Sequence, residues 1–138
     1  MITVFFDGLC EPKNPGGVAT YGYVIYRGIK KIKAGCRVIG SGVGMTNNVA
    51  EYSGLKRAAE WINQNGIEDD ILFKGDSQLV INQMNGIWQI KSGTSRRFVP
   101  EIRGLLKGKR VKFVWVPREQ NAEADMLSNV AYRRFVKR

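Results

Sequence analysis

The chain has no histidine and only two cysteines among its 138 residues. Without histidine, every mechanism that needs an imidazole as base, nucleophile or metal ligand is excluded. The cysteines, Cys10 and Cys36, are too few for a disulfide framework, and we expect a cytoplasmic protein, although one bridge between them stays open. No apolar run approaches the roughly 18 residues of a membrane span. The chemistry of this chain must therefore rest on carboxylates.

Acidic residues are also scarce, with 12 against 22 basic residues and a net charge of +10. A balance this basic favours a polyanionic partner, and nucleic acid is the first candidate. A surface kept soluble by its charge, or the Lys and Arg enrichment of a thermophile, would give the same balance. The length and the 43% hydrophobic content suit one domain, residues 1–138, with one core. We expect this domain to act as a monomer.

The hydrophobic pattern predicts three strands, followed by helices that alternate with two more strands. The apolar run Ile2–Phe6, which Asp7 ends, is typical of a strand buried on both faces. Four further strands are predicted at about 21–26, 30–39, 71–76 and 111–116, and helices at about 46–66, 77–85, 98–106 and 122–136. The segment 88–97 reads as irregular. This order predicts an α/β fold with a five-stranded mixed sheet, three antiparallel strands before parallel crossovers, and helices on both faces.

Four acids follow predicted strands or begin predicted helices: Asp7, Glu51, Asp76 and Asp125. Each alone has a simple structural explanation. Asp7-Gly8 can be a turn, Glu51 can form a capping box with Asn48, Asp76 can cap a helix, and Asp125 can be a solvated acid near a helix start.

Their placement together predicts a metal site. Asp7 and Asp76 would end neighbouring strands, at the edge where open α/β sheets bind ligands. The first turns that carry Glu51 and Asp125 can point at this same edge. Converging carboxylates repel one another unless cations neutralise them. Oxygen ligands alone suit Mg²⁺ or Mn²⁺, and two such ions are the usual apparatus for displacement at phosphorus.

Five ordered pieces of the sequence resemble a type 1 ribonuclease H over essentially the whole chain. They are Phe6-Asp7-Gly8, Asn14-Pro15-Gly16, Thr46-Asn47-Asn48 with Glu51, Gly75-Asp76-Ser77-Gln78, and Asn121 with Asp125. The loop 116–121 is most similar to short archaeal-like members, and the segment 86–95 is too short for the basic protrusion of larger ones. The resemblance implies a ribonuclease H-like fold and an endonuclease that cleaves the RNA strand of RNA/DNA hybrids, leaving 5′-phosphate and 3′-hydroxyl ends.

The resemblance also implies which residues bind the metal ions. Asp7 would bridge two Mg²⁺ or Mn²⁺ ions, Glu51 and Asp76 would complete the ligands of one ion, and Asp125 those of the other. Many family members carry a histidine in the loop before the last acid. Arg118 stands in that loop here, where it can hold a phosphate or simply pair with Glu119.

A further set of residues resembles the family's substrate contacts. Amide side chains beside the metal ions can recognise the 2′-hydroxyl that distinguishes RNA from DNA. Contacts with the minor groove or the RNA strand are implied for Asn14, Asn48, Gln78 and the backbone near Cys10, and a DNA-strand phosphate for Thr46 and Asn47. Capping of helices and loops is the alternative explanation for these amides.

Two other functional classes remain open from the sequence. A non-catalytic module could bind hybrids or double-stranded RNA through shape and charge, and another nuclease, such as a resolvase or integrase, could share the fold. Four intact acids argue against a pure binding module, because such a module gains from losing negative charge that faces phosphates. The expected partner is therefore an RNA/DNA hybrid, with double-stranded RNA as a further candidate.

Overall fold

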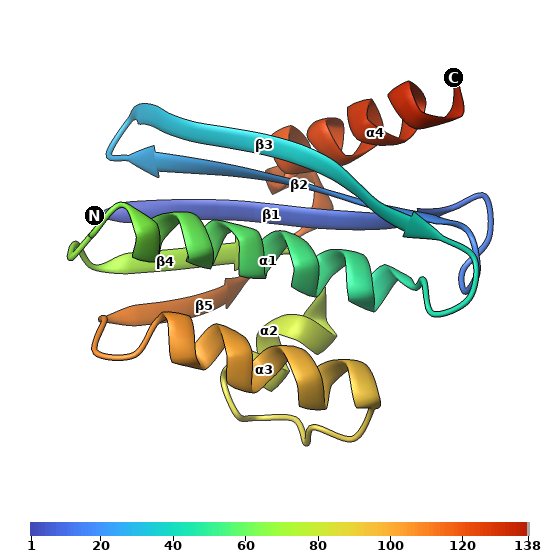
Figure 1. Cartoon of the computed structure of the whole chain (residues 1–138). Helices are drawn as coiled ribbons and strands as arrows, with labels where there is room; N and C mark the ends of the chain where they lie inside the picture. The colour runs from blue at the N-terminus through green and yellow to red at the C-terminus, as the bar shows by residue number, and fades with distance from the viewer. Residues whose placement is uncertain (138) are drawn as a thin grey trace.

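A mixed five-stranded sheet forms the centre of the computed structural model, which describes residues 1–137. In the order β3-β2-β1-β4-β5, the strands β1 (Ile2–Glu11), β2 (Val18–Arg27) and β3 (Lys30–Ser41) form an antiparallel meander (Figure 1). The strands β4 (Ile71–Gly75) and β5 (Val111–Trp115) lie parallel to β1. This arrangement confirms the predicted mixed sheet.

Helices cover both faces of the sheet, as predicted. The four helices are α1 (Asn47–Gln64), α2 (Gln78–Met84), α3 (Gly93–Leu105) and α4 (Ala122–Val136). In Figure 1, α1 crosses the near face of the sheet with α3 beside it, and α4 lies behind β2 and β3. None of the helices in the described residues has the length and hydrophobicity that a membrane-spanning segment requires.

The core lies between the sheet and the layer of α1 and α3. The side chains of Ile2, Val4 and Phe6 are fully buried, whereas Thr3 and Phe5 between them are partly exposed. Apolar residues recur along α1 at the spacing of one helical face, and all five of them are buried: Val49, Tyr52, Leu55, Ala59 and Ile62. The helical periodicity of this segment therefore predicted correctly which side of α1 packs on the sheet.

Two element boundaries differ most from the prediction. The first strand does not end at Asp7 but continues to Glu11, because residues Gly8–Glu11 remain paired with β2. The third helix begins at Gly93, within a segment expected to be irregular, and the Ser92 side chain caps it by accepting a hydrogen bond from Ser95 N at 3.1 Å. Gly93, Thr94 and Ser95 in this first turn are poor helix formers. Ser92, a residue type that favours the N-cap position, is thus the only local sequence signal for a helix start at Gly93.

Candidate active site

A cleft opens where two strands of the sheet part. β1 pairs with β4 only over Ile2–Phe5, while it stays paired with β2 along its full length. The cavity at this fork has a volume of about 420 Å³ and lies at the carboxyl end of the parallel strands. Its lining residues are Asp7, Gly8, Asn47, Asn48, Glu51, Asp76, Ser77, Trp115 and Arg118.

Three of the four acids meet in this cleft. One carboxylate oxygen from each of Asp7, Glu51 and Asp76 lies within 4.8 Å of the others. Asp7 and Glu51 are only 4% and 7% exposed, and Asp76 is half-buried. Glu51 was expected in the first turn of its helix. It is the fifth residue of α1 and therefore reaches the cleft from the second turn.

The buried Oε2 atom of Glu51 has no hydrogen-bond partner among the described residues. An unpartnered carboxylate oxygen in the protein interior is costly, because it has lost its water and gained nothing in exchange. A bound cation would remove this cost. The carboxylate set and its unsatisfied oxygen therefore fit a hard divalent ion such as Mg²⁺ or Mn²⁺.

Burial and mutual repulsion favour the protonated forms of these acids. Burial raises the pKa of Asp7 to about 7, helped by the charge of Asp76 and opposed by a hydrogen bond with Glu51. Burial and the charge of Asp7 also hold the pKa of Glu51 well above its usual range. The pKa of Asp76 is raised by burial, although the Asn121 side chain and the Arg118 charge oppose the shift.

Two glycines allow the helices to approach Asp7 from opposite faces of the sheet. A Cβ atom on Gly8 would lie 2.4 Å from the backbone of Ala50 and Glu51. Gly22 is the pairing partner of Asp7 in the β1–β2 ladder, and its Cβ would lie 2.5 Å from the carbonyl oxygen of Ala124. The lack of side chains at both positions lets α1 and α4 approach close to Asp7.

Three of the simple structural explanations for the acids do not hold. Asp7-Gly8 lies in extended strand and not in a turn. The cap of α1 is Thr46, whose Oγ1 accepts from Val49 N at 3.1 Å. The cap of α2 is Ser77, whose Oγ accepts from Val80 N at 3.2 Å. Asp7, Glu51 and Asp76 are thus not explained by turn or capping roles.

The fourth acid, Asp125, lies in the first turn of α4. It does not belong to the set of carboxylates within 4.8 Å. Asp125 nevertheless interacts with two acids of the cleft. A side-chain hydrogen bond with Asp125 raises the pKa of Asp7, and the negative charge of Asp125 raises the pKa of Asp76. The backbone of Asp125 is held in place by the helix bond from its N–H to the carbonyl oxygen of Asn121, at 3.1 Å.

The expected substrate contacts are only partly brought together. Asn47 and Asn48 line the cleft, and the Asn14 side chain accepts a hydrogen bond from Asn47 N at 3.1 Å. Gln78 is exposed at the start of α2, next to the cleft residue Ser77. Cys10 is buried and lies outside the lining, where its free thiol donates to the carbonyl oxygens of Lys13 and Met45. Cys36 is also a free thiol, so no bridge joins the two cysteines.

Arg118 lines the cleft, and no ion pair joins it to Glu119 among residues 1–137. Its positive charge lowers the pKa of Asp76, which places the guanidinium near that acid. Arg118 is exposed, so its donors are open to a ligand in the cleft. The alternative explanation of a surface pair with Glu119 is therefore wrong.

Two residues near the acids were given no role from the sequence, although Asn121 was named with Asp125 in the family resemblance. Trp115, at the end of β5, lines the cleft and donates from Nε1 to the carbonyl oxygen of Asp76 at 3.1 Å. Asn121 donates from Nδ2 to the carbonyl oxygen of Phe6 at 2.8 Å. The signal for Trp115 was available, since an aromatic residue at the end of a strand beside β4 must lie close to Asp76.

Comparisons with known proteins show which family this chain resembles. Residues 6–131 match the model of a family described as "Reverse transcriptase-like". A ribonuclease HI of Halobacterium salinarum is 39% identical over 132 residues, which cover 94% of this chain and 63% of that protein. The chain thus spans less than two thirds of this relative, and 57% of an uncharacterised Bacillus subtilis protein that is 32% identical.

Solved structures match over nearly the whole chain. The crystal structure of RNase H1 from Halobacterium salinarum is 35% identical, with a TM-score of 0.85 and coverage of 96% of this chain and 97% of that one. LC11-RNase H1, crystallised in complex with an RNA/DNA hybrid, is 30% identical, with a TM-score of 0.89 and coverage of 99% of both chains. The connection between α2 and α3 here is confined to residues 85–92, in line with a chain that has no basic protrusion.

Proposed function

The chain belongs to the type 1 ribonuclease H family, and on this basis we propose that it cleaves the RNA strand of RNA/DNA hybrids. The observation that carries the proposal is the meeting of Asp7, Glu51 and Asp76 in a cleft that also presents amides and an arginine. The reaction is an endonucleolytic phosphodiester hydrolysis that leaves 5′-phosphate and 3′-hydroxyl ends. The solved relative that holds an RNA/DNA hybrid supports this choice of substrate.

We propose that the four acids hold two Mg²⁺ or Mn²⁺ ions. Asp7 contributes to both ions, Glu51 and Asp76 to one, and Asp125 to the other. The unpartnered Oε2 of Glu51 and the raised pKa values of Asp7 and Glu51 support metal binding, because a divalent cation would supply the partner and the positive charge that these carboxylates lack. When bound, the ions lower the pKa of the attacking water and stabilise charge on the leaving 3′ oxygen.

Arg118 and the amides of the cleft position the substrate. An arginine stays protonated at neutral pH, so Arg118 holds a phosphate oxygen and does not transfer a proton. The side chains of Asn48, Asn14 and Gln78 contact the RNA strand or the minor groove, where the 2′-hydroxyl offers both a donor and an acceptor. The first turn of α1, with Thr46 and Asn47, holds a phosphate of the DNA strand.

A cleavage assay tests the proposal. A labelled RNA/DNA hybrid is incubated with the protein and Mg²⁺ or Mn²⁺, with EDTA and the Asp7→Asn variant as controls. A DNA duplex, single-stranded RNA and double-stranded RNA are assayed beside it. We expect metal-dependent cuts that are confined to the RNA of the hybrid and are lost in both controls.

The Asp76→Asn variant separates catalysis from binding. It should lose cleavage and still bind the hybrid, because the change removes one carboxylate and leaves the side chains of Asn47, Asn48 and Arg118 in place. Full activity of this variant would rule out Asp76 as a ligand. Tight hybrid binding by the wild-type protein without cleavage in either metal would identify a binding module, and cutting of DNA duplexes would identify a different nuclease on the same fold.

A further inference from the structure

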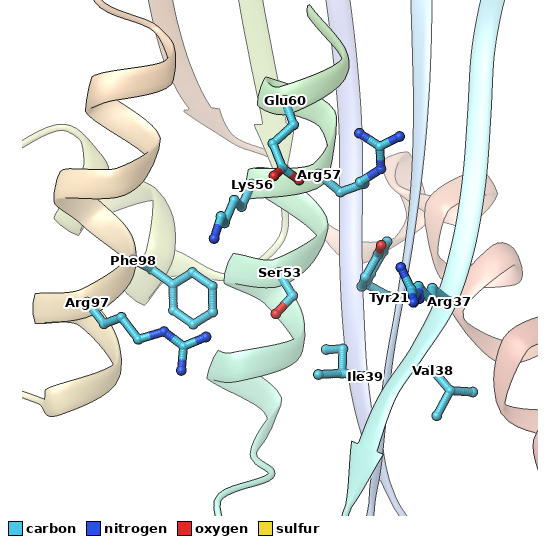
Figure 2. Close-up of a pocket in the computed structure, with 10 residues that line it drawn as sticks. All are labelled: Tyr21, Arg37, Val38, Ile39, Ser53, Lys56, Arg57, Glu60, Arg97 and Phe98. Carbon is cyan, nitrogen blue, oxygen red and sulfur yellow. The ribbon is translucent and has the colours of Figure 1, made fainter. Parts of the chain in front are cut away.

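A second hollow lies on the outer side of α1 (Figure 2). It has a volume of about 250 Å³ and is walled by β3 on one side and α3 on the other. Its α1 residues are Ser53, Lys56, Arg57 and Glu60, which share one helical face. Glu51, two residues before Ser53, points about 200° away around the helix. This hollow is therefore separate from the cleft that holds the acids.

Cationic side chains from three elements line the hollow. They are Arg37 from β3, Lys56 and Arg57 from α1, and Arg97 from α3, and we call the hollow the basic groove. Glu60 is the single acid among its described lining residues. The groove thus carries a local excess of positive charge, and none of the acids of the cleft lines it.

The arginines nearest β3 lack internal partners. Lys56 is paired with Glu101, and the Arg97 guanidinium lies 4.6 Å from the centre of the Phe98 ring. For Arg37 and Arg57, no ion pair or hydrogen bond of the side chain occurs within residues 1–137. Like charges held together without partners repel, and a bound anion relieves that repulsion.

The surface chemistry of the groove favours phosphates over bases. Bases in single strands are usually held by stacking on exposed aromatic rings. Here the aromatic side chains are hidden, with Tyr21 only 7% exposed and Phe98 only 2% exposed. Arginines and the Ser53 hydroxyl offer donors to phosphate oxygens instead, which is contact without sequence preference.

The position of the groove favours a nucleic acid over an acidic peptide. The groove lies on the same helix as Thr46 and Asn47, where the proposed function places a phosphate of the DNA strand. Ser53 is about 10 Å further along this helix, a span of about three nucleotides at a rise of roughly 3.4 Å each. The groove's volume of about 250 Å³ is below the roughly 300 Å³ of a drug-sized pocket, so a small-molecule ligand is not the expected occupant.

We propose that the basic groove binds the phosphate backbone of single-stranded DNA where the DNA strand of a hybrid continues beyond the duplex. The inference rests on the proposed function for its substrate. The protein would then bind most tightly where a hybrid ends in a DNA overhang, with Arg37 and Arg57 as the main contacts. The contact adds affinity for the flanking strand and takes no part in the chemical step.

The test compares a blunt hybrid with the same hybrid carrying a tail of about six deoxythymidines at the 3′ or the 5′ end of its DNA strand. Binding is measured by fluorescence anisotropy with the Asp76→Asn chain in Mg²⁺, over a range of salt concentrations. We expect one of the two tails to tighten binding. The log–log salt dependence should steepen by about 0.7 for each phosphate that the groove holds.

Charge variants assign this gain to the groove. The double variant Arg37→Ala/Arg57→Ala should lose roughly three- to tenfold in affinity for the tailed hybrid, as expected for two exposed charge pairs, and little for the blunt one. Lys30→Ala/Lys107→Ala removes the same charge from exposed positions outside the groove and should keep the gain. The conservative Arg37→Lys/Arg57→Lys variant should also keep most of it.

A second variant covers the case in which the arginine double variant does not fold. Ser53→Glu places a negative charge in the groove from a partly exposed helical position, and Ser53→Gln is its neutral match. Only the glutamate should weaken binding of the tailed hybrid. Thermal melting of each variant shows whether it is folded.

Several outcomes would overturn the inference. One is that neither tail increases the affinity for the hybrid. Another is that the two alanine double variants lose the same affinity for the tailed hybrid. A third is that polyglutamate displaces the tail from the groove as readily as an oligonucleotide of equal charge does. The last result would assign the groove to an acidic protein partner. Absence of blunt-hybrid binding and cleavage would instead contradict the proposed function, so the two failures are distinguishable.

Discussion

The side-chain amide of Asn121 donates a hydrogen bond of 2.8 Å to the carbonyl oxygen of Phe6, which precedes Asp7 in β1. Asn121 also precedes α4, and its backbone carbonyl accepts the bond from Asp125 N. A single buried residue, 1% exposed, thus ties the strand that carries one acid to the helix that carries another. The remaining Oδ1 atom of Asn121 has no partner among the described residues.

Asn121→Ala should weaken both stability and activity. The change leaves the Phe6 carbonyl oxygen buried without its donor, which costs about 1–3 kcal/mol of unfolding free energy. The rate of hybrid cleavage should fall by more than the fraction of protein that unfolds, because α4 is no longer held against β1. Urea unfolding and cleavage at 25 °C measure the two effects. Asn65→Ala removes a comparable amide bond, to Trp61 O, from an exposed helix end and should leave cleavage unchanged.

Gly8→Ala should disrupt the site by steric overlap. The new methyl group would lie 2.4 Å from the backbone of α1 beside Glu51, so strand and helix must separate. A loss of about 3 kcal/mol in stability is expected, together with weaker Mg²⁺ binding measured by calorimetry. In contrast, Gly104→Ala lies in α3 with open space around it and should stabilise the protein by up to about 1 kcal/mol. Equal effects at the two positions would contradict the close packing described for Gly8.

Without metal, stability should fall as the pH rises from about 4 to 7. In this range the folded protein keeps a proton on Asp7, whose pKa is raised from 3.8 to about 7, while the unfolded chain has lost it. The folded state therefore binds more protons, and each rise in pH favours unfolding at this site. Thermal melting in EDTA across this range measures the trend, and Mg²⁺ should reverse it by replacing the protons.

Asp7→Asn should remove the part of this pH dependence that Asp7 contributes, while Glu51 and Asp76 keep theirs. In EDTA near pH 8 the variant should be more stable than the wild-type protein by on the order of 2 kcal/mol, because no buried charge is left at that position. Near pH 4 the difference should vanish. Glu11→Gln, an exposed acid at the end of β1, serves as the control and should change neither value. A wild-type melting temperature that climbs between pH 5 and 8 in EDTA would refute the protonated cluster.

Glu123 and Asp125, two acids in the first turn of α4, should respond differently to substitution. Glu123 accepts a hydrogen bond from the Tyr26 hydroxyl and pairs with Lys31, so Glu123→Gln should cost about 0.5–1 kcal/mol of stability and little activity. Loss of a residue that only hydrogen-bonds a metal ligand lowers activity by up to roughly a hundredfold. Asp125→Asn removes a proposed ligand itself, so it should lower cleavage by at least that much. Comparable activities of the two variants would refute the assignment of Asp125 to the metal site.

The location of the acid cluster could be predicted because it follows from sheet geometry. Asp7 and Asp76 lie near the carboxyl ends of parallel segments, and such ends must meet at one edge. Glu51 was expected there from its nearness to a helix start, although it lies in the second turn of α1 and not in the first. Local patterns therefore sufficed for the meeting of Asp7, Glu51 and Asp76 and for the pairing of the strands that carry two of them.

Other features depend on contacts that no local pattern records. The extension of β1 beyond Asp7 requires the pairing of Gly8–Glu11 with β2, a partner segment that the apolar run does not indicate. The basic groove brings together Arg37, Arg57 and Arg97, which belong to three separate elements. Each of these arginines alone reads as an ordinary solvated cation, so only the folded chain shows that they converge.

The fork between β1 and β4 has a mechanical consequence. Asp7 lies in β1 and Asp76 directly follows β4, and these strands belong to one hydrogen-bonded sheet, since β1 is paired with β2 along Ile2–Glu11 and with β4 along Ile2–Phe5. Changing the separation of β1 and β4 would break ladder hydrogen bonds, so the sheet holds the backbones of these two acids at a fixed spacing. Under the proposed function this fixed spacing would act as a gauge, and we expect a duplex of the wrong width to fail because its backbone cannot reach both acids at the same time.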